Sequence, residues 1–116
     1  MKKAFTLPTC KTCQRIFDDL QPGSHGFEVI DIKSEGISAE DLDHMAALAG
    51  SYEALFSRRA MKFRSMGLAD QNLEEQDYRR LILEEYTFLK RPVFLTDDVV
   101  TAGSAKAAVE AARQLL

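Results

Sequence analysis

Short apolar runs alternate with helical patterns along this chain. Residues 3–7 form a first run of strand formers, which a proline ends. From residue 11 to 20 the apolar side chains fall on one helical face, and a Pro-Gly pair ends that pattern. Residues 27–32 are again rich in strand formers. The first third of the chain therefore predicts a β–α–β unit, whose crossover length suits two parallel strands.

The middle of the chain is predicted to be helical. One helix begins after Ser38, a residue type that caps helices well, and ends at Gly50. Short helices are expected at 52–56 and 60–66, and a longer one at 73–86. The inner face of this longer helix is expected to hold Tyr78, Leu81, Ile82 and Tyr86.

The last part predicts a β-hairpin followed by a helix. Pro92 opens an apolar run, Asp97-Asp98 makes a turn, and residues 99–102 return. Ser104 is expected to cap the final helix. The order is therefore β–α–β, helices, β–β–α, which is an α/β protein. With 116 residues and no internal repeat or linker, we expect one domain.

Composition is that of an ordinary globular protein, with 46% hydrophobic and 28% charged residues. A net charge of −3 argues against direct binding of nucleic acid, which favours a basic surface. No apolar run approaches the ~20 residues that span a bilayer, and the apolar stretch at the start is too short for a signal peptide. We therefore expect a cytoplasmic protein that has no membrane partner.

The two cysteines, Cys10 and Cys13, lie where the first strand gives way to a helix. Backbone N–H groups at a helix start and the charge of Lys11 both stabilise a thiolate at Cys10. In a reducing compartment such a pair is typical of catalytic, redox-sensing or metal-binding sites. We interpret Cys10 as the nucleophile and Cys13 as a more buried resolving thiol with the higher pKa. The N–H groups from Lys11 through Thr12 to Cys13 can also hold an oxyanion.

Three other interpretations of the cysteine pair stay open. A structural zinc site needs four ligands, and the remaining candidates, His25 and His44, fit no common zinc-finger spacing. Both cysteines can instead be small buried hydrophobic residues. Finally, one cysteine can be active while the other is passive.

Arginines near two predicted elements are candidate anion ligands. Arg58 and Arg59 precede a short helix, and Arg91 stands directly before Pro92 and a core strand. The forked donors of a guanidinium suit an anion bound to a thiol, although pairing with the chain's 18 carboxylates is the alternative. Pro92 either opens the strand in the ordinary way or follows a cis bond, which about one X–Pro bond in twenty adopts.

Four segments together resemble the arsenate reductase-like (ArsC/Spx) family. They are Cys10-Lys11-Thr12-Cys13-Gln14-Arg15, Leu55-Phe56-Ser57-Arg58-Arg59, Met66-Gly67-Leu68 and Lys90-Arg91-Pro92-Val93-Phe94-Leu95. The match runs in order over nearly the whole chain. The resemblance implies a thioredoxin-like fold with a mixed central sheet flanked by helices. It implies one domain over residues 1–116, with a helical insertion at about 34–90.

The same resemblance assigns roles to individual residues. It implies that Cys10 is the nucleophile and that Arg91 is the anion-binding arginine before a cis-proline, Pro92. Arg59, or less directly Arg58, corresponds to the arginine of the insertion. Glutaredoxin-coupled members use one active-site cysteine and a third arginine near the last strand, where this chain has none in residues 100–104.

Two function hypotheses follow. In the first, the protein is a thiol oxidoreductase that acts on a small oxyanion or a disulfide, has no bound cofactor, and takes electrons from glutathione with glutaredoxin or thioredoxin. In the second, the C-x-x-C pair and Gly103 indicate the Spx branch. Its members bind RNA polymerase and sense oxidation through a redox-active disulfide. A protein of this family shape without a redox role is the third alternative.

Overall fold

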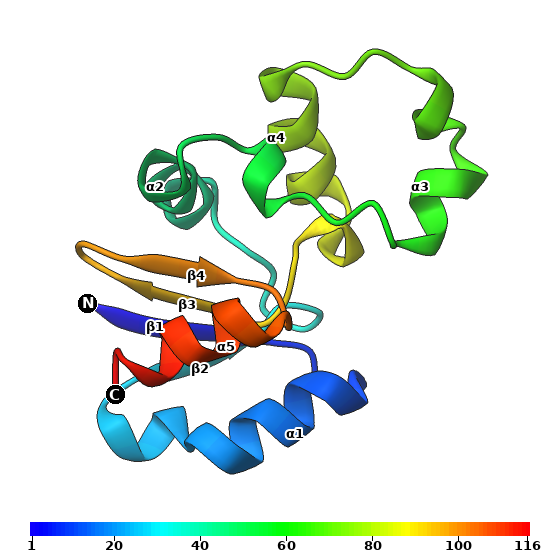
Figure 1. Cartoon of the computed structure of the whole chain (residues 1–116). Coiled ribbons are helices and arrows are strands. Elements are labelled where there is room, and N and C mark those ends of the chain that lie inside the picture. Colours follow the sequence, from blue (N-terminus) through cyan, green and yellow to red (C-terminus); the bar gives the residue numbers. More distant parts are fainter. The chain divides into compact units, whose positions relative to one another are not determined.

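The computed structural model describes all residues 1–116 and divides them into two compact units (Figure 1). The first unit joins Met1–Gly36 to Arg91–Leu116, and the second is Ile37–Lys90. The second unit falls within the helical segment that the sequence places at about 34–90. The organisation as a single domain stays a prediction.

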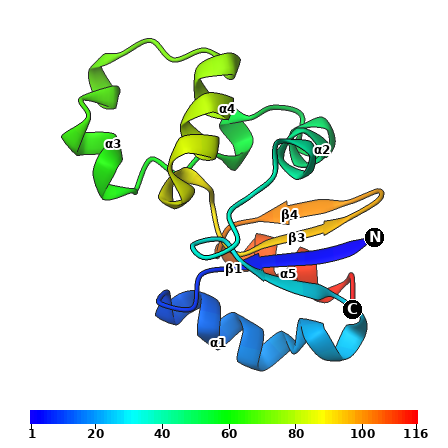
Figure 2. The ribbon, with the colours of Figure 1, turned by 180° about the vertical axis from the view of Figure 1, so that it is seen from behind.

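The first unit is built on a four-stranded mixed sheet with the order β2-β1-β3-β4. Its elements are β1 (Lys2–Thr6), α1 (Lys11–Leu20), β2 (Glu28–Asp31), β3 (Val93–Thr96), β4 (Val100–Ala102) and α5 (Lys106–Arg113), with a short 3₁₀ turn, η1, at Pro22–His25. Strand β1 runs parallel to β2 and antiparallel to β3, and β3 and β4 form a hairpin. This strand order, also visible from behind (Figure 2), confirms the thioredoxin-like α/β fold.

The core on one face of the sheet is formed by α1 and α5. Ile16 and Leu20 from α1 and Ala112 from α5 share a buried cluster with Ala4 and Phe94 of the sheet. The ring of Phe94 packs against two other rings, with centroid distances of 5.5 Å to Phe17 and 5.6 Å to Phe27. The helical face predicted from the sequence for residues 11–20 is thus the face that packs on the sheet.

The second unit is helical, as predicted. Its elements are α2 (Ala39–Ala49), η2 (Glu53–Leu55), α3 (Met61–Ser65), η3 (Leu68–Asp70), α4 (Glu75–Glu84) and η4 (Tyr86–Phe88). Ser38 caps α2, because its hydroxyl accepts the N–H of Asp41 at 3.0 Å. In this unit the ring of Phe56 stacks on that of Phe88, with 5.0 Å between ring centroids, and packs edge-on against the ring of Tyr78, with 4.9 Å between centroids.

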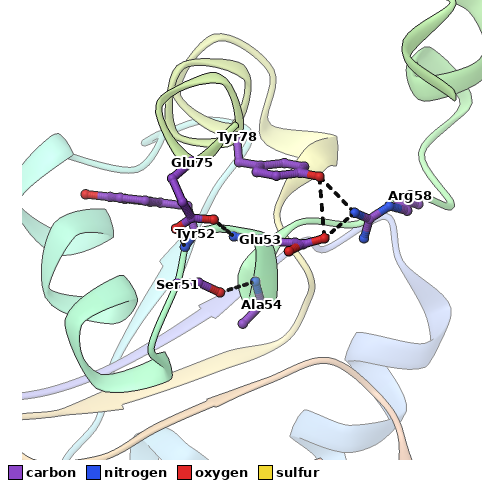
Figure 3. Close-up of polar contacts among 7 residues, drawn as sticks. All are labelled: Ser51, Tyr52, Glu53, Ala54, Arg58, Glu75 and Tyr78. Carbon is purple, nitrogen blue, oxygen red and sulfur yellow. Dashed lines mark hydrogen bonds and ion pairs between the residues drawn. The ribbon is translucent and has the colours of Figure 1, made fainter. Parts of the chain in front are cut away.

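A polar network ties η2 to α4 (Figure 3). The Glu75 carboxylate accepts the backbone N–H of Tyr52 at 2.6 Å and that of Glu53 at 3.1 Å. Arg58 donates to the Glu53 carboxylate at 2.7 Å and to the Tyr78 hydroxyl at 2.9 Å. A carboxylate that satisfies the free N–H groups at the start of a short helix stabilises the helix end.

The short helix expected at 52–56 is the 3₁₀ helix η2 (Glu53–Leu55), held by the carboxylate just described. Two predicted details are wrong. The N-cap of α5 is Ala105 and makes no side-chain capping bond, so Ser104 is not the cap. Tyr86 is half-buried in η4 because α4 ends at Glu84, and the fully buried side chains after that helix are Phe88 and Leu89.

Truncation of Phe94 tests the core of the first unit. The side chain is 1% exposed, so Phe94→Ala removes a buried ring and leaves a cavity between α1 and the sheet. We expect the free energy of unfolding to fall by about 3–5 kcal/mol, measured by urea unfolding followed by circular dichroism. Val99→Ala, at a side chain 40% exposed, is the control and should change it by less than about 0.5 kcal/mol. Equal losses in both variants would contradict this core.

Candidate active site

The turn that joins β1 to α1 carries Cys10. The N–H of Cys10 donates to the carbonyl of Leu7 at 2.9 Å, which closes a four-residue turn through Pro8 and Thr9. Cys10 has extended backbone angles, φ −89° and ψ 109°, and is the N-cap of α1. Its sulfur accepts the N–H of Cys13 at 3.4 Å. The sulfur thus takes the place that a serine or aspartate oxygen occupies in an ordinary helix cap.

The surroundings of Cys10 favour its thiolate. Partial burial alone would raise the pKa of the thiol. Hydrogen bonds from the backbone N–H and the thiol of Cys13, the positive charge of Arg91 and the backbone N–H of Thr12 act in the opposite direction. Together they outweigh the burial, so the pKa of Cys10 is lowered from its ordinary value. The direction is the one expected for a cysteine at a helix start next to an arginine.

Cys13 is the opposite case. Its side chain is 0% exposed, and this burial, with the hydrogen bond and charge of Cys10, raises the pKa of Cys13 to about 11. It is therefore protonated at neutral pH, and its thiol can donate to the Cys10 sulfur. Both cysteines are free thiols in the structure. The site pairs an ionisable, partly accessible sulfur with a protonated, buried one.

Arg91 and Pro92 complete the part of the site that belongs to the first unit. The Arg91–Pro92 peptide bond is cis. Arg91 is half-buried and its Nε atom is buried. Its charge helps to lower the pKa of Cys10 and opposes, without cancelling, the rise in the pKa of Cys13. The Pro92 carbonyl accepts the N–H of Gly103 at 3.0 Å. Gly103 has φ 102°, a conformation that glycine adopts without steric cost, so this contact also fixes the end of β4.

The remaining predicted residues are placed differently. Lys11 is exposed at the first position of α1, and Thr12 is half-buried behind it. Arg59 is exposed in the second unit, so its relation to Cys10 stays a prediction. Its neighbour Arg58 instead holds Glu53 and Tyr78 within that unit, with the guanidinium 5.6 Å from the centre of the Tyr78 ring.

One residue of the site was missed by sequence reasoning. The side-chain amide of Gln14 donates to the carbonyl of Pro8, inside the turn that carries Cys10. A polar residue on an exposed helix position carries no signal in a single sequence, so nothing distinguished Gln14 from its solvated neighbours.

For the zinc interpretation, no group of three or more His, Cys, Asp or Glu side chains in the chain could hold a metal ion. None of the helices has the length and apolar character needed to span a membrane.

Comparison with known proteins identifies the family of the chain. The family model described as ArsC family matches residues 5–112, which include Cys10, Cys13, Arg91 and Pro92. The chain belongs to the ArsC family. A search of the curated proteins finds no match.

Solved structures of ArsC-type proteins have the same fold. The arsenate reductase from Vibrio cholerae superposes with a TM-score of 0.81 at 16% identity, over 99% of this chain and 97% of that one. An arsenate reductase (ArsC) related protein from Brucella melitensis is 27% identical, with a TM-score of 0.69 over 95% of this chain and 92% of its own. At such identities the fold is shared, and the substrate has to be argued from the site.

Removal of the Arg91 charge tests the electrostatics of the site. In Arg91→Met the thiolate of Cys10 loses a nearby cation, so its pKa should rise. We expect alkylation of reduced Cys10 by iodoacetamide at pH 7 to slow by about threefold, while the rate at high pH is unchanged. Arg113→Met removes an equal charge that pairs with Asp19 at 2.8 Å, and serves as the matched control. A similar slowing in this control would mean that net charge, and not the position of Arg91, sets the reactivity.

Proposed function

We propose that the protein is a thiol-dependent oxidoreductase in which Cys10 attacks a small oxyanion of the arsenate type or a disulfide. The observation that carries this proposal is the Cys10 sulfur at the start of α1, where it accepts the N–H of Cys13 at 3.4 Å and has a lowered pKa. A lowered pKa increases the fraction of the nucleophilic thiolate at neutral pH, and the position of the sulfur beside backbone N–H groups suits a negatively charged substrate.

The reaction on arsenate proceeds in two steps. The Cys10 thiolate displaces one oxygen of arsenate(V), which leaves as water after protonation, and an S–As bond forms. A second thiol then loses its proton and attacks the Cys10 sulfur. The S–As bond breaks and its electron pair stays on arsenic, which leaves as arsenite(III). Two thiols have become one disulfide, which accounts for both electrons.

On a disulfide substrate the same thiolate attacks one sulfur and releases the other half as a thiolate. Cys13 is placed to supply the second thiol in either reaction, since it contacts Cys10 directly. Its pKa of about 11 keeps it protonated in the resting protein, and loss of the Cys10 thiolate removes part of the cause of that high pKa. Attack by Cys13 then closes a Cys10–Cys13 disulfide.

The residues around Cys10 are proposed to hold the anion. Arg91 supplies a positive charge, and the N–H groups from Lys11 to Cys13 supply donors. Arg59 is proposed as the second arginine. The electrons are proposed to come from glutathione with glutaredoxin or thioredoxin, in the cytoplasm, where such donors are kept reduced. No bound cofactor is needed for this chemistry.

A redox sensor of the Spx type is the second candidate, favoured by one observation: both thiols are free and lie in contact, so a disulfide can form as a switch. Its partner would be RNA polymerase. The sensor would show a disulfide that forms readily and no turnover of arsenate or of a small disulfide.

Turnover measurements on cysteine variants test the enzyme. With arsenate, glutathione and glutaredoxin, the wild-type chain should produce arsenite, and Cys10→Ser should lower the rate by about a hundredfold or more. Cys13→Ser should lower it by about tenfold at low glutathione and less at high glutathione, because an external thiol then resolves the intermediate.

The proposed enzymatic function would be contradicted if the wild-type chain turned over neither arsenate nor hydroxyethyl disulfide. Ready formation of the Cys10–Cys13 disulfide in that case would favour the sensor. Equal activity of Cys10→Ser and wild type would exclude Cys10 as the nucleophile.

A further inference from the structure

Gln14 contacts the chain at Cys10 and at Pro8, two residues before it. Its backbone N–H donates to the Cys10 carbonyl at 3.0 Å, as the first regular bond of α1. Its side-chain amide turns back and donates to the carbonyl of Pro8, two residues before Cys10. One residue therefore holds both the helix that supplies the N–H groups and the turn that supplies the sulfur.

The Pro8 carbonyl has a special place in this turn. The turn closes from the Cys10 N–H to the Leu7 carbonyl, so the Pro8–Thr9 peptide is its central peptide. The common turn types with proline at the second position differ in the orientation of that peptide, and type II needs a positive φ at the third residue, which Thr9 does not have. Pro8 and Thr9 are both exposed. The Gln14 amide is a contact that ties the carbonyl of this central peptide to α1.

We propose that Gln14 is a positioning residue for Cys10. It holds the turn so that the Cys10 sulfur continues to accept hydrogen bonds from the N–H groups of Thr12 and Cys13. This inference rests on the proposed role of Cys10 as the nucleophile. Without the Gln14 bond the turn can shift relative to the start of α1, and such a shift moves the Cys10 sulfur away from the N–H groups of the helix. At 3.4 Å the contact between the Cys13 N–H and the sulfur weakens with such a movement, and the thiolate loses stabilisation.

The contact with the Pro8 carbonyl depends on a donor at the end of a side chain of this length. Glutamate would bring a negative charge and no donor at neutral pH, and asparagine is one methylene shorter. Methionine has nearly the shape of glutamine without the donor, so Gln14→Met removes the hydrogen bond and keeps the size.

Alkylation of Cys10 in Gln14→Met tests the proposal. The full chain is reduced and treated with iodoacetamide between pH 5 and pH 10, and the alkylated peptide is identified by mass spectrometry. We expect the rate at neutral pH to fall by about threefold and the rate at high pH to stay at the wild-type value, because the thiolate is less populated but not less reactive.

Gln21→Met is the matched control. Gln21 lies at the other end of α1, and its side-chain amide also donates to a backbone carbonyl, that of Asp18 at 3.0 Å. Both variants lose one hydrogen bond at an end of the same helix, so both can lower the melting temperature. Only Gln14→Met should shift the pH profile of Cys10.

Two results would overturn the proposal. An unchanged profile in Gln14→Met, with wild-type Cys10 showing its lowered pKa, would leave Gln14 as an ordinary structural residue and leave the proposed function intact. An equal shift in Gln21→Met would assign the effect to general loosening of α1. A wild-type Cys10 that titrates like a free thiol would instead mean that the proposed function itself has failed.

Discussion

The chemistry of this protein depends on one hydrogen bond, from the Cys13 N–H to the Cys10 sulfur at the start of α1. That contact caps the helix and stabilises the thiolate at the same time. Cys13, one turn further along the helix, is buried and lies beside Cys10, and both effects raise its pKa to about 11. The difference between the two thiols therefore comes from burial and from position at the end of the helix, and not from the residue type.

The sheet places the second part of the site. Strands β1 and β3 are antiparallel neighbours, with Phe5 opposite Val93. Because the two strands are antiparallel, β3 begins at the same end of the sheet where β1 ends. Arg91 and Pro92, directly before β3, therefore lie near the turn that carries Cys10. The charge of Arg91 accordingly acts on both cysteines. The buried packing of Phe94, two residues further along β3, keeps this register in place.

Much of this arrangement could be predicted from the sequence, because strong local signals carry it. The apolar run before Cys10 and the helical face after it placed the cysteines at a strand-to-helix junction, and Pro92 marked the start of β3. Long-range polar contacts left no such signal. Gln14 reads as a solvated helix residue, and Arg58 differs from Arg59 by its bonds to Glu53 and Tyr78. Ser104 fitted the residue preference for a helix cap, but the chain turns into α5 one residue later.

The most direct test of the account is a titration of the two thiols by NMR, with ¹³C at the β-carbons of Cys10 and Cys13 in the reduced protein. The account predicts two separate transitions: Cys10 ionises below the ordinary range for cysteine, and Cys13 ionises near pH 11. Overlapping transitions at the ordinary value, or Cys13 ionising first, would contradict the central place given to the Cys10 sulfur.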